Sequence, residues 1–180
     1  MGQPRWATTS DQYILPTAGD AWAAEASAGG ERGSQRILSA GTIPAPDDIA
    51  EGLRIPAGTS VVARRRLILA DDRPVEIACS YWPASIAGMT ILAEPEKVSG
   101  GTARFLAEVG YEPHEVHEDI TAAAAQAVTS LDERMAMQLG DGDPVLVLTR
   151  IVLDAAGQPY QVDVNVMVAG RHTRYVRSAG

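Results

Sequence analysis

Three consecutive arginines, Arg64, Arg65 and Arg66, lie within an apolar run that is typical of a β-strand. Side chains alternate between the two faces of a strand, so Arg64 and Arg66 point to the same side. Guanidinium groups among apolar neighbours bind carboxylates or other anions. The pair therefore predicts either a site for a ligand with an acidic group or an internal arginine–carboxylate pair with no ligand.

Glu76 is the carboxylate best placed to join this pair, because it lies in the apolar run that follows the turn. The face on which it lies depends on the turn between the two strands. A two-residue loop places Glu76 opposite Leu67, whereas an odd-length loop places it opposite Arg66. The residues at 71–73 fit a three-residue loop, which would gather two arginines and one carboxylate into a cluster.

A second polar face is expected in the run QVDVNVMV near the C-terminal end. The valines of this run share one face, which must pack on a core. Gln161, Asp163, Asn165 and Met167 share the other face. This polar face either meets solvent or lines a pocket, and solvent is the commoner case for an antiparallel sheet.

Other residue patterns give little support for catalysis. His114 and His117 have a spacing that occurs in metal sites, but a closed site needs more ligands and we expect no metal. Cys79 is predicted to be a small buried residue. The sequence contains no nucleophile elbow, phosphate-binding loop or Cys-x-x-Cys motif, so we expect neither an enzyme nor a cofactor.

The composition narrows the class of protein further. The chain has 180 residues and a net charge of −8, and Lys97 is its one lysine. This charge argues against binding to nucleic acid by the chain alone. The lone cysteine excludes a disulfide framework and fits a reducing compartment. With no apolar run long enough to cross a membrane and no signal peptide, we expect a cytoplasmic domain without a membrane partner.

One stretch of the sequence occurs twice at a nearly constant spacing, and each copy reads as a short helix, a glycine turn and a β-hairpin. The residue pairs that recur include Gly58 and Gly142, Val61 and Val145, Arg66 and Arg150, and Pro74 and Pro159. A unit that recurs once is not a solenoid. We therefore expect two related halves of one domain, with a cleft between their hairpins.

The two copies differ at polar positions. Arg64 has Leu148 as its counterpart, and Glu76 has Gln161. From this asymmetry we expect charge to be concentrated in the first copy, where it would contact a ligand.

Turn and capping signals predict the elements that position these residues. We expect strands at 35–43, 61–69, 74–82, 144–153 and 161–168, and helices at 47–53, 102–109 and 130–140. Asp47 or Asp48 would cap the first of these helices, and Ser130 with Glu133 forms a capping box for the last. Residues 1–34 are predicted to be a linker or extended arm with a short helix capped by Asp20. The alternative is a lead-in segment that packs its aromatic residues on the domain.

Several of these motifs together resemble the UTRA domain, the effector-binding domain of GntR-type transcriptional regulators of the HutC subfamily. The resemblance covers residues 35–180 and rests on GLRIPAGTSVV, VVARRRLILADDRPVEIACSYWP, GGTARFLAEVGY and LGDGDPVLVLTRIVLDAAGQPYQV. It implies an α+β fold of the chorismate-lyase type, with an antiparallel sheet and packed helices. It also implies a homodimer and a small-molecule effector. DNA would be contacted only through a winged-helix domain, which residues 1–34 are too short and too acidic to form.

The resemblance also suggests which residues contact the effector. The family's arginine pair falls on Arg64 and Arg66, its acidic residue after the hairpin proline falls on Glu76, and the counterpart in the second hairpin falls on Gln161. With the available hydroxyl of the middle helix and the strand neighbours of Gln161, the expected ligand-binding residues are Arg64, Arg66, Glu76, Thr102, Gln161, Asp163 and Asn165. The alternatives are a chorismate-lyase-like enzyme, which shares the fold, and a stand-alone dimerisation or binding module.

Overall fold

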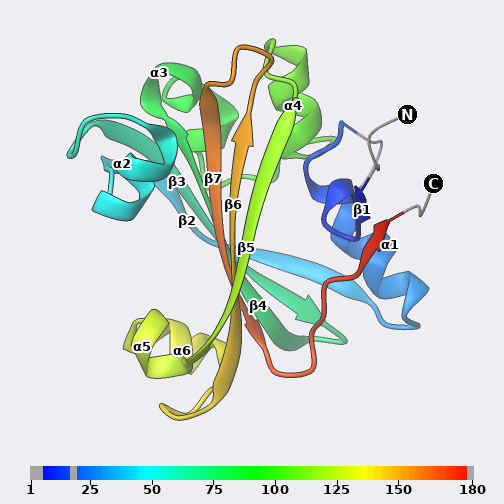
Figure 1. Ribbon diagram of the computed structural model, residues 1–180. Coiled ribbons are helices and arrows are strands. Elements are labelled where there is room, and N and C mark those ends of the chain that lie inside the picture. Colours follow the sequence, from blue (N-terminus) through cyan, green and yellow to red (C-terminus); the bar gives the residue numbers. More distant parts are fainter. Residues whose placement is uncertain (1–5, 17–19, 178–180) are drawn as a thin grey trace.

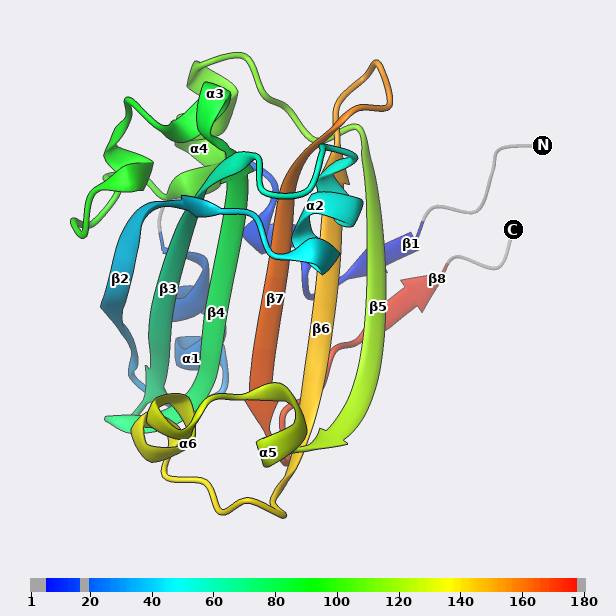
Figure 2. The ribbon, with the colours of Figure 1, turned by 90° about the vertical axis from the view of Figure 1, so that its left-hand side faces the viewer.

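The computed structural model describes residues 6–16 and 20–177 of the chain. Its centre is an antiparallel sheet that is seen face-on in Figure 2. In spatial order its strands are β2 (Gly33–Pro44), β3 (Ser60–Ala70), β4 (Arg73–Pro83), β7 (Pro159–Val168), β6 (Pro144–Leu153) and β5 (Glu115–Ala124). The α+β fold class that the sequence implied is confirmed.

Short helices cover both faces of this sheet (Figure 1). One face carries α2 (Asp47–Leu53), α5 (Ala125–Val128) and α6 (Leu131–Met137). The other face carries α1 (Ala21–Ala28), α3 (Ala84–Ala87), α4 (Thr102–Glu108) and the 3-10 turns η1 (Asp11–Tyr13) and η2 (Ile91–Ala93). The strands β1 (Trp6–Thr8) and β8 (Tyr175–Arg177) form a separate two-stranded ribbon.

The sequence repeat corresponds to two structural halves, α2–β3–β4 and α6–β6–β7, whose hairpins pair through β4 and β7. Each helix packs on the hairpin of the other half: Leu53 of α2 contacts a cluster with Val162 of β7, and Met137 of α6 contacts Ile77 of β4. Figure 2 shows α2 and α6 at opposite ends of the sheet. Neither half buries its helix alone, so the two halves form one domain.

The two halves also share unusual backbone geometry. Both helices end in a non-glycine residue with left-handed dihedral angles, Arg54 (φ 54°, ψ 41°) and Gln138 (φ 58°, ψ 39°). Both hairpins contain an extra residue just after the turn, with the register shifting between Ile68 and Leu69 in one and between Val152 and Leu153 in the other. Such bulges are recurrent, position-specific features, so they support a structural duplication.

The first hairpin turn differs from both registers that we considered. Ala70 pairs with Arg73 around a two-residue loop in which Asp71 and Asp72 both have positive φ, as a type I′ turn requires. The bulge then shifts the pairing so that Glu76 lies opposite Ile68. Glu76 therefore shares a face with Arg64 and Arg66, and its partner lies two residues along β3 from the one that a three-residue loop would give.

Most of the expected elements agree with the structure to within a few residues, and the differences have local causes. The helix at 47–53 has Pro46 at its N-cap, with no side-chain hydrogen bond, so the prediction of an aspartate cap was wrong. Asp47 and Asp48 occupy its first turn instead, where their negative charge interacts favourably with the positive end of the helix dipole. The capping box of Ser130 and Glu133 is confirmed, but the helix ends at Met137 rather than Gly140.

The core contains the apolar residues that strand alternation predicted. Val162 and Val166 are buried on the face that carries α2 and α5. Cys79 is buried beside Leu67 and Met137, as expected for a small apolar residue.

Helix α1 lies against the sheet, whereas residues 27–32 are exposed. The side chain of Asp20 accepts a hydrogen bond from the Ala23 amide, so the predicted cap of this helix is confirmed. Trp22 and Ala26 of α1 are buried against a cluster that includes Ile68. The division of the chain at residue 34 stays a prediction, although β2 already begins at Gly33.

Candidate functional site

A cavity of about 860 Å³ lies between one face of the sheet and the segments that cover it. Its floor is built from side chains of neighbouring strands that share this face. These are Arg64, Arg66 and Ile68 of β3, Glu76, Ala78 and Ser80 of β4, Gln161, Asp163, Asn165 and Met167 of β7, and Leu148 and Arg150 of β6. The polar face of QVDVNVMV therefore lines a pocket and does not form an open solvent-exposed surface.

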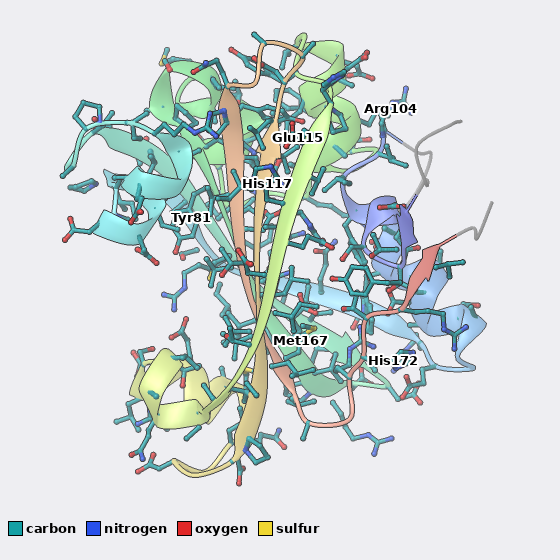
Figure 3. The ribbon with its side chains drawn as sticks, in the orientation of Figure 1. Tyr81, Arg104, Glu115, His117, Met167 and His172 are labelled. Atoms are coloured by element: carbon teal, nitrogen blue, oxygen red, sulfur yellow. The ribbon has the colours of Figure 1, made fainter. Side chains whose placement is uncertain are left out.

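The opposite wall of the cavity is formed by residues 9–15 and 20–25, together with residues 171–173. We call residues 9–15 and 20–28 the roof segment. Figure 1 shows α1 and the β1–β8 ribbon on the side of the sheet away from α2 and α6. In Figure 3, Met167 lies on this side, whereas Tyr81 lies on the side of α2. Part of the cavity is thus formed by the segment that the sequence predicted to be a linker or extended arm.

The sheet register arranges the polar floor residues in rows. One row crosses the sheet from Arg64 through Ser80 and Asp163 to Arg150. The next row runs from Arg66 through Ala78 and Asn165 to Leu148, and a third pairs Ile68 with Glu76 and Met167. All seven residues that we expected to bind a ligand line this one cavity. Six of them lie on the strands, and Thr102 lies in the first turn of α4. Their roles in ligand binding stay predictions.

Arg64 is held by the protein itself. Its Nη1 donates a 2.6 Å hydrogen bond to the carbonyl oxygen of Glu94, and its Nη2 donates to the carbonyl of Glu96. Burial and, next, the positive charge of Arg66 lower the pKa of Arg64. Arg64 thus fastens the connection between η2 and α4 to the sheet, and two of its donors are already committed.

Arg66 and Asn165 have unused hydrogen-bonding capacity. The Nη2 atom of Arg66 reaches the hydroxyl of Ser80 only at 3.4 Å, and its buried Nε has no partner among the described residues. The buried Oδ1 of Asn165 likewise has no partner in the described part of the chain. Buried polar groups are rarely left unsatisfied, so a donor and an acceptor on one row indicate a place for a ligand or water.

Arg150 is the centre of a buried network that the sequence analysis missed. Its Nε donates to Glu118 at 2.8 Å, its Nη1 to Asp163 at 3.2 Å and its Nη2 to the hydroxyl of Ser10 at 2.9 Å. The side chains of Arg150 and Asp163 are almost fully buried. The sequence repeat could have indicated that Arg150 lies in the site, because Arg150 is the counterpart of Arg66. The second copy therefore also places charge in the cavity, in Arg150 and Asp163.

Gln161 extends this network to Trp82 in the hydrophobic core. Its Oε1 accepts a 3.0 Å hydrogen bond from the indole of Trp82, and its Nε2 donates to both carboxylate oxygens of Asp163 at 3.0 and 2.8 Å. Gln161 and Asp163 are therefore occupied by protein partners. They shape the cavity wall, and no donor or acceptor of Gln161 is left without a partner.

Glu76 lies in the cavity floor without an ion-pair partner among the described residues. Burial raises the pKa of Glu76 to about 7, although nearby arginines, foremost Arg171, act in the opposite direction. The carboxyl group therefore exchanges a proton near neutral pH. A perturbed carboxyl group in a cavity is a feature of ligand-binding and catalytic sites alike.

The roof segment is fixed by a second polar cluster around Glu25. Its carboxylate accepts hydrogen bonds from Gln12 at 2.8 Å, Tyr13 at 2.6 Å and Arg171 at 2.9 Å. The guanidinium of Arg171 also lies 4.7 Å from the ring centre of Trp22, within the range of a cation–π contact. No sequence pattern linked these residues, because they meet only in the folded chain.

The two histidines of the HEVHED stretch do not contribute to the cavity. His117 lies on the edge strand β5 and contacts Glu115 at 2.6 Å (Figure 3). Within residues 6–16 and 20–177, no group of three or more His, Cys, Asp or Glu side chains is placed to hold a metal ion. In the same residues no helix is both long and apolar enough to span a membrane.

Comparison with known proteins agrees with the architecture. The family model of the UTRA domain matches residues 28–173. An uncharacterised HTH-type transcriptional regulator of Streptomyces coelicolor is 28% identical over 143 residues, which cover 78% of this chain and 52% of that protein. A relative in Rhizobium meliloti with the same description is 26% identical over 75% of this chain. The chain spans about half the length of both relatives.

Solved structures show the same fold. The ligand-binding domain of a protein described as a GntR-family transcriptional regulator from Bordetella bronchiseptica superposes with a TM-score of 0.66 and 25% identity, covering 83% of this chain and 90% of that one. The effector domain of PhnF from Mycobacterium smegmatis gives 0.68 at 16% identity, covering 83% and 89%. The family model covers most of the described residues, and the chain therefore belongs to the UTRA domain family.

Proposed function

We propose that this chain is the effector-sensing domain of a GntR-type transcriptional regulator of the HutC subfamily. The observation that carries the proposal is the cavity on the polar face of the sheet, in which Arg66 and Asn165 have unsatisfied buried atoms. Largely preformed concave sites with a few polar groups among apolar ones are typical of small-molecule binding. We expect the effector to be a small metabolite with an anionic group.

The proposed partners follow from the family. The protein would act in the cytoplasm as a homodimer and would contact DNA through a winged-helix domain outside the residues described. With a net charge of −8 the chain itself is a poor ligand for DNA. In a gel-shift assay at moderate salt, the chain alone is expected to leave operator DNA unshifted.

A route from the cavity to the roof segment supports a regulatory role. Arg150, in the floor of the cavity, donates a hydrogen bond to the hydroxyl of Ser10 in the roof segment. Arg171 donates another to the carboxylate of Glu25, which also belongs to the roof segment. A ligand that displaces or strengthens these bonds changes the position of the roof segment. Such a ligand shifts a conformational equilibrium only if it binds one position of this segment better than another.

The chorismate-lyase-like alternative has weaker support. Glu76 has a raised pKa and shares its face with Arg66, which a lyase site would also require. The cavity offers no second group in an evident catalytic arrangement with Glu76, and the relatives that match are described as transcriptional regulators. Incubation with chorismate is expected to release no pyruvate, and turnover would favour the enzyme.

The test of the proposed function is a thermal-shift screen of cytoplasmic metabolites against the chain and its Arg66→Ala variant. An effector should raise the unfolding temperature of the wild-type chain, because it binds only the folded state. The variant should fold but lose this shift. Arg73→Ala is the matched control, since Arg73 is exposed on the same hairpin outside the cavity. If every stabilising metabolite acts equally on Arg66→Ala, the assignment of the cavity fails.

A further inference from the structure

Arg66 and Arg150 occupy equivalent positions in the two halves of the domain, but their surroundings differ. Each arginine lies in the first strand of its hairpin and points into the same cavity. The sheet register places one residue directly across from each arginine on either side. The comparison of these neighbours shows what a buried arginine in this scaffold requires.

Arg150 has a carboxylate on both sides. Asp163 lies opposite on β7 and Glu118 lies opposite on β5, and both bind the guanidinium at 3.2 and 2.8 Å. A buried guanidinium is stable only when its charge is matched and its donors are used. The second half of the domain meets this requirement with its own side chains.

Arg66 has an apolar residue at both corresponding places. Ala78 lies opposite on β4, where the repeat aligns it with Asp163, and Ile37 lies opposite on β2. Among the described residues Arg66 forms no ion pair, its Nε has no partner, and its one hydrogen bond spans 3.4 Å. Ala78 ends at Cβ, so the space that a carboxylate fills beside Arg150 belongs to the cavity beside Arg66.

We propose that the ligand of this cavity carries a carboxylate that lies over Ala78 and binds Arg66, in the way that Asp163 binds Arg150. The proposal rests on the proposed function of the cavity and names the chemical class of its effector. The neighbouring acceptor, Asn165 Oδ1, has no partner among the described residues, so we expect the same ligand to carry a hydrogen-bond donor for it. Ile37 and Ile68 also line the cavity, so we expect the rest of the ligand to be apolar where it contacts them. The effector is therefore a small, partly apolar carboxylic acid with an adjacent hydroxyl or amino group.

The charges around Arg66 favour a carboxylate over a phosphate. Arg64 has committed two of its donors to backbone carbonyls, so Arg66 is the member of the arginine pair with free donors. Glu76 lies diagonally next to it on the same face. Whenever Glu76 is ionised, a doubly charged phosphate beside it meets more like-charge repulsion than a singly charged carboxylate does.

Filling the space with a side chain tests the proposal without any ligand. Ala78→Asp supplies the missing carboxylate, and Ala78→Asn has the same shape without the charge. We expect Ala78→Asp to unfold about 2–4 °C above Ala78→Asn, because Arg66 pairs with the new carboxylate. In the Arg66→Ala background the order should reverse, since the carboxylate is then buried alone. An Asn variant as stable as the Asp variant, with Arg66 present, would overturn the proposal.

A second experiment uses small probes in place of the effector. Sodium 2-hydroxyisovalerate combines a carboxylate, a neighbouring hydroxyl and a branched apolar body. At constant ionic strength it should raise the unfolding temperature of the wild-type chain more than inorganic phosphate or the neutral amide of the same acid does. Both Ala78 variants should lose this shift, with apparent affinity reduced roughly tenfold or more because they occupy the same space. A larger shift with phosphate, or an undiminished shift in Ala78→Asn, would refute the carboxylate assignment.

These outcomes separate the proposal from the function on which it rests. A neutral or phosphorylated effector from the metabolite screen, lost in Arg66→Ala, would leave the sensing function in place and refute the carboxylate. Coupling between Arg66 and Ala78→Asp without any stabilising metabolite would support the carboxylate site and count against effector sensing.

Discussion

The indole nitrogen of Trp82 donates a 3.0 Å hydrogen bond to the side-chain oxygen of Gln161, and both side chains are buried. The amide nitrogen of Gln161 in turn donates to Asp163, so one glutamine joins the hydrophobic core to the charged network of the cavity. Gln161 is the counterpart of Glu76 in the repeat. Equivalent positions thus have different roles, because Gln161 is satisfied by protein partners and Glu76 lines the cavity without an ion-pair partner among the described residues.

Replacement of Gln161 should affect stability more than ligand binding. Gln161→Ala leaves the indole of Trp82 without an acceptor and removes a donor from Asp163, which should cost about 1–3 kcal/mol of unfolding free energy. Urea unfolding at neutral pH measures the loss. Gln158→Ala in the exposed turn of the same hairpin is the control and should change stability by less than about 0.5 kcal/mol. Equal losses in both variants would contradict the structural role of Gln161.

The equivalent arginines give a second prediction. Arg150→Met leaves the buried carboxylates of Asp163 and Glu118 without their cation, so it should lower the unfolding free energy by about 3–5 kcal/mol. Arg66→Met removes a charge that has no carboxylate partner, and it should be close to neutral or stabilising. Urea unfolding of the two variants under identical conditions compares them. Similar destabilisation in both would mean that Arg66 is paired within the protein.

Glu76 should make stability depend on pH near neutrality. Its pKa rises from an ordinary 4.5 to about 7 on folding, so between these values the folded state retains a proton that the unfolded state has lost. The unfolding free energy therefore falls as the pH rises through this window, by an amount on the order of 3 kcal/mol. Glu76→Gln cannot ionise and should gain stability relative to the wild-type chain from pH 4.5 to pH 7.5.

Denaturant unfolding at several pH values, compared between variant and wild type, measures this gain. Glu31→Gln changes an exposed carboxylate and serves as the control. A constant difference between Glu76→Gln and the wild-type chain across the window would show that Glu76 is charged in the folded protein.

Trp22 should hold the roof segment on the sheet. Its ring is buried among α1 and sheet residues, its indole nitrogen donates to the Leu69 carbonyl at 2.8 Å, and Arg171 stacks on it. Trp22→Ala should cost about 3–5 kcal/mol of local stability. Amide hydrogen exchange of α1 should then accelerate at least about a hundredfold while the strands remain protected. Trp22→Phe, which retains most of the ring packing, should give an intermediate rate, and equal acceleration in the strands would contradict independent opening.

Much of this fold could be predicted from the sequence, because alternation and turn residues determine the hairpins locally. The strands at 144–153 and 161–168 follow from their valines and from the glycine turn between them. The bulge at Val75 could not be predicted in the same way. No glycine marks it, and the aspartates of the preceding turn adopt positive φ without one.

The candidate site was predictable as a set of residues but not as a set of contacts. Alternation places Arg64 and Arg66 on one face, and the structure agrees. That Arg64 is held by two carbonyls of the irregular stretch at 94–96 depends on tertiary packing alone. The role of Arg150 was hidden for a similar reason, since its partners lie on three separate segments.

The β1–β8 ribbon places the two ends of the described chain beside each other, next to the roof segment. Each strand of this ribbon has three residues, and so small a unit opens far more often than the central sheet. Glu25 and Arg171 both line the cavity and are joined by a hydrogen bond, so we expect opening of this contact, with the neighbouring ribbon, to speed the entry and departure of a ligand on this side. The residence time of a ligand is then governed by segments that need not touch it, so substitutions in the ribbon can alter the duration of a signal without altering the chemistry that recognises the effector.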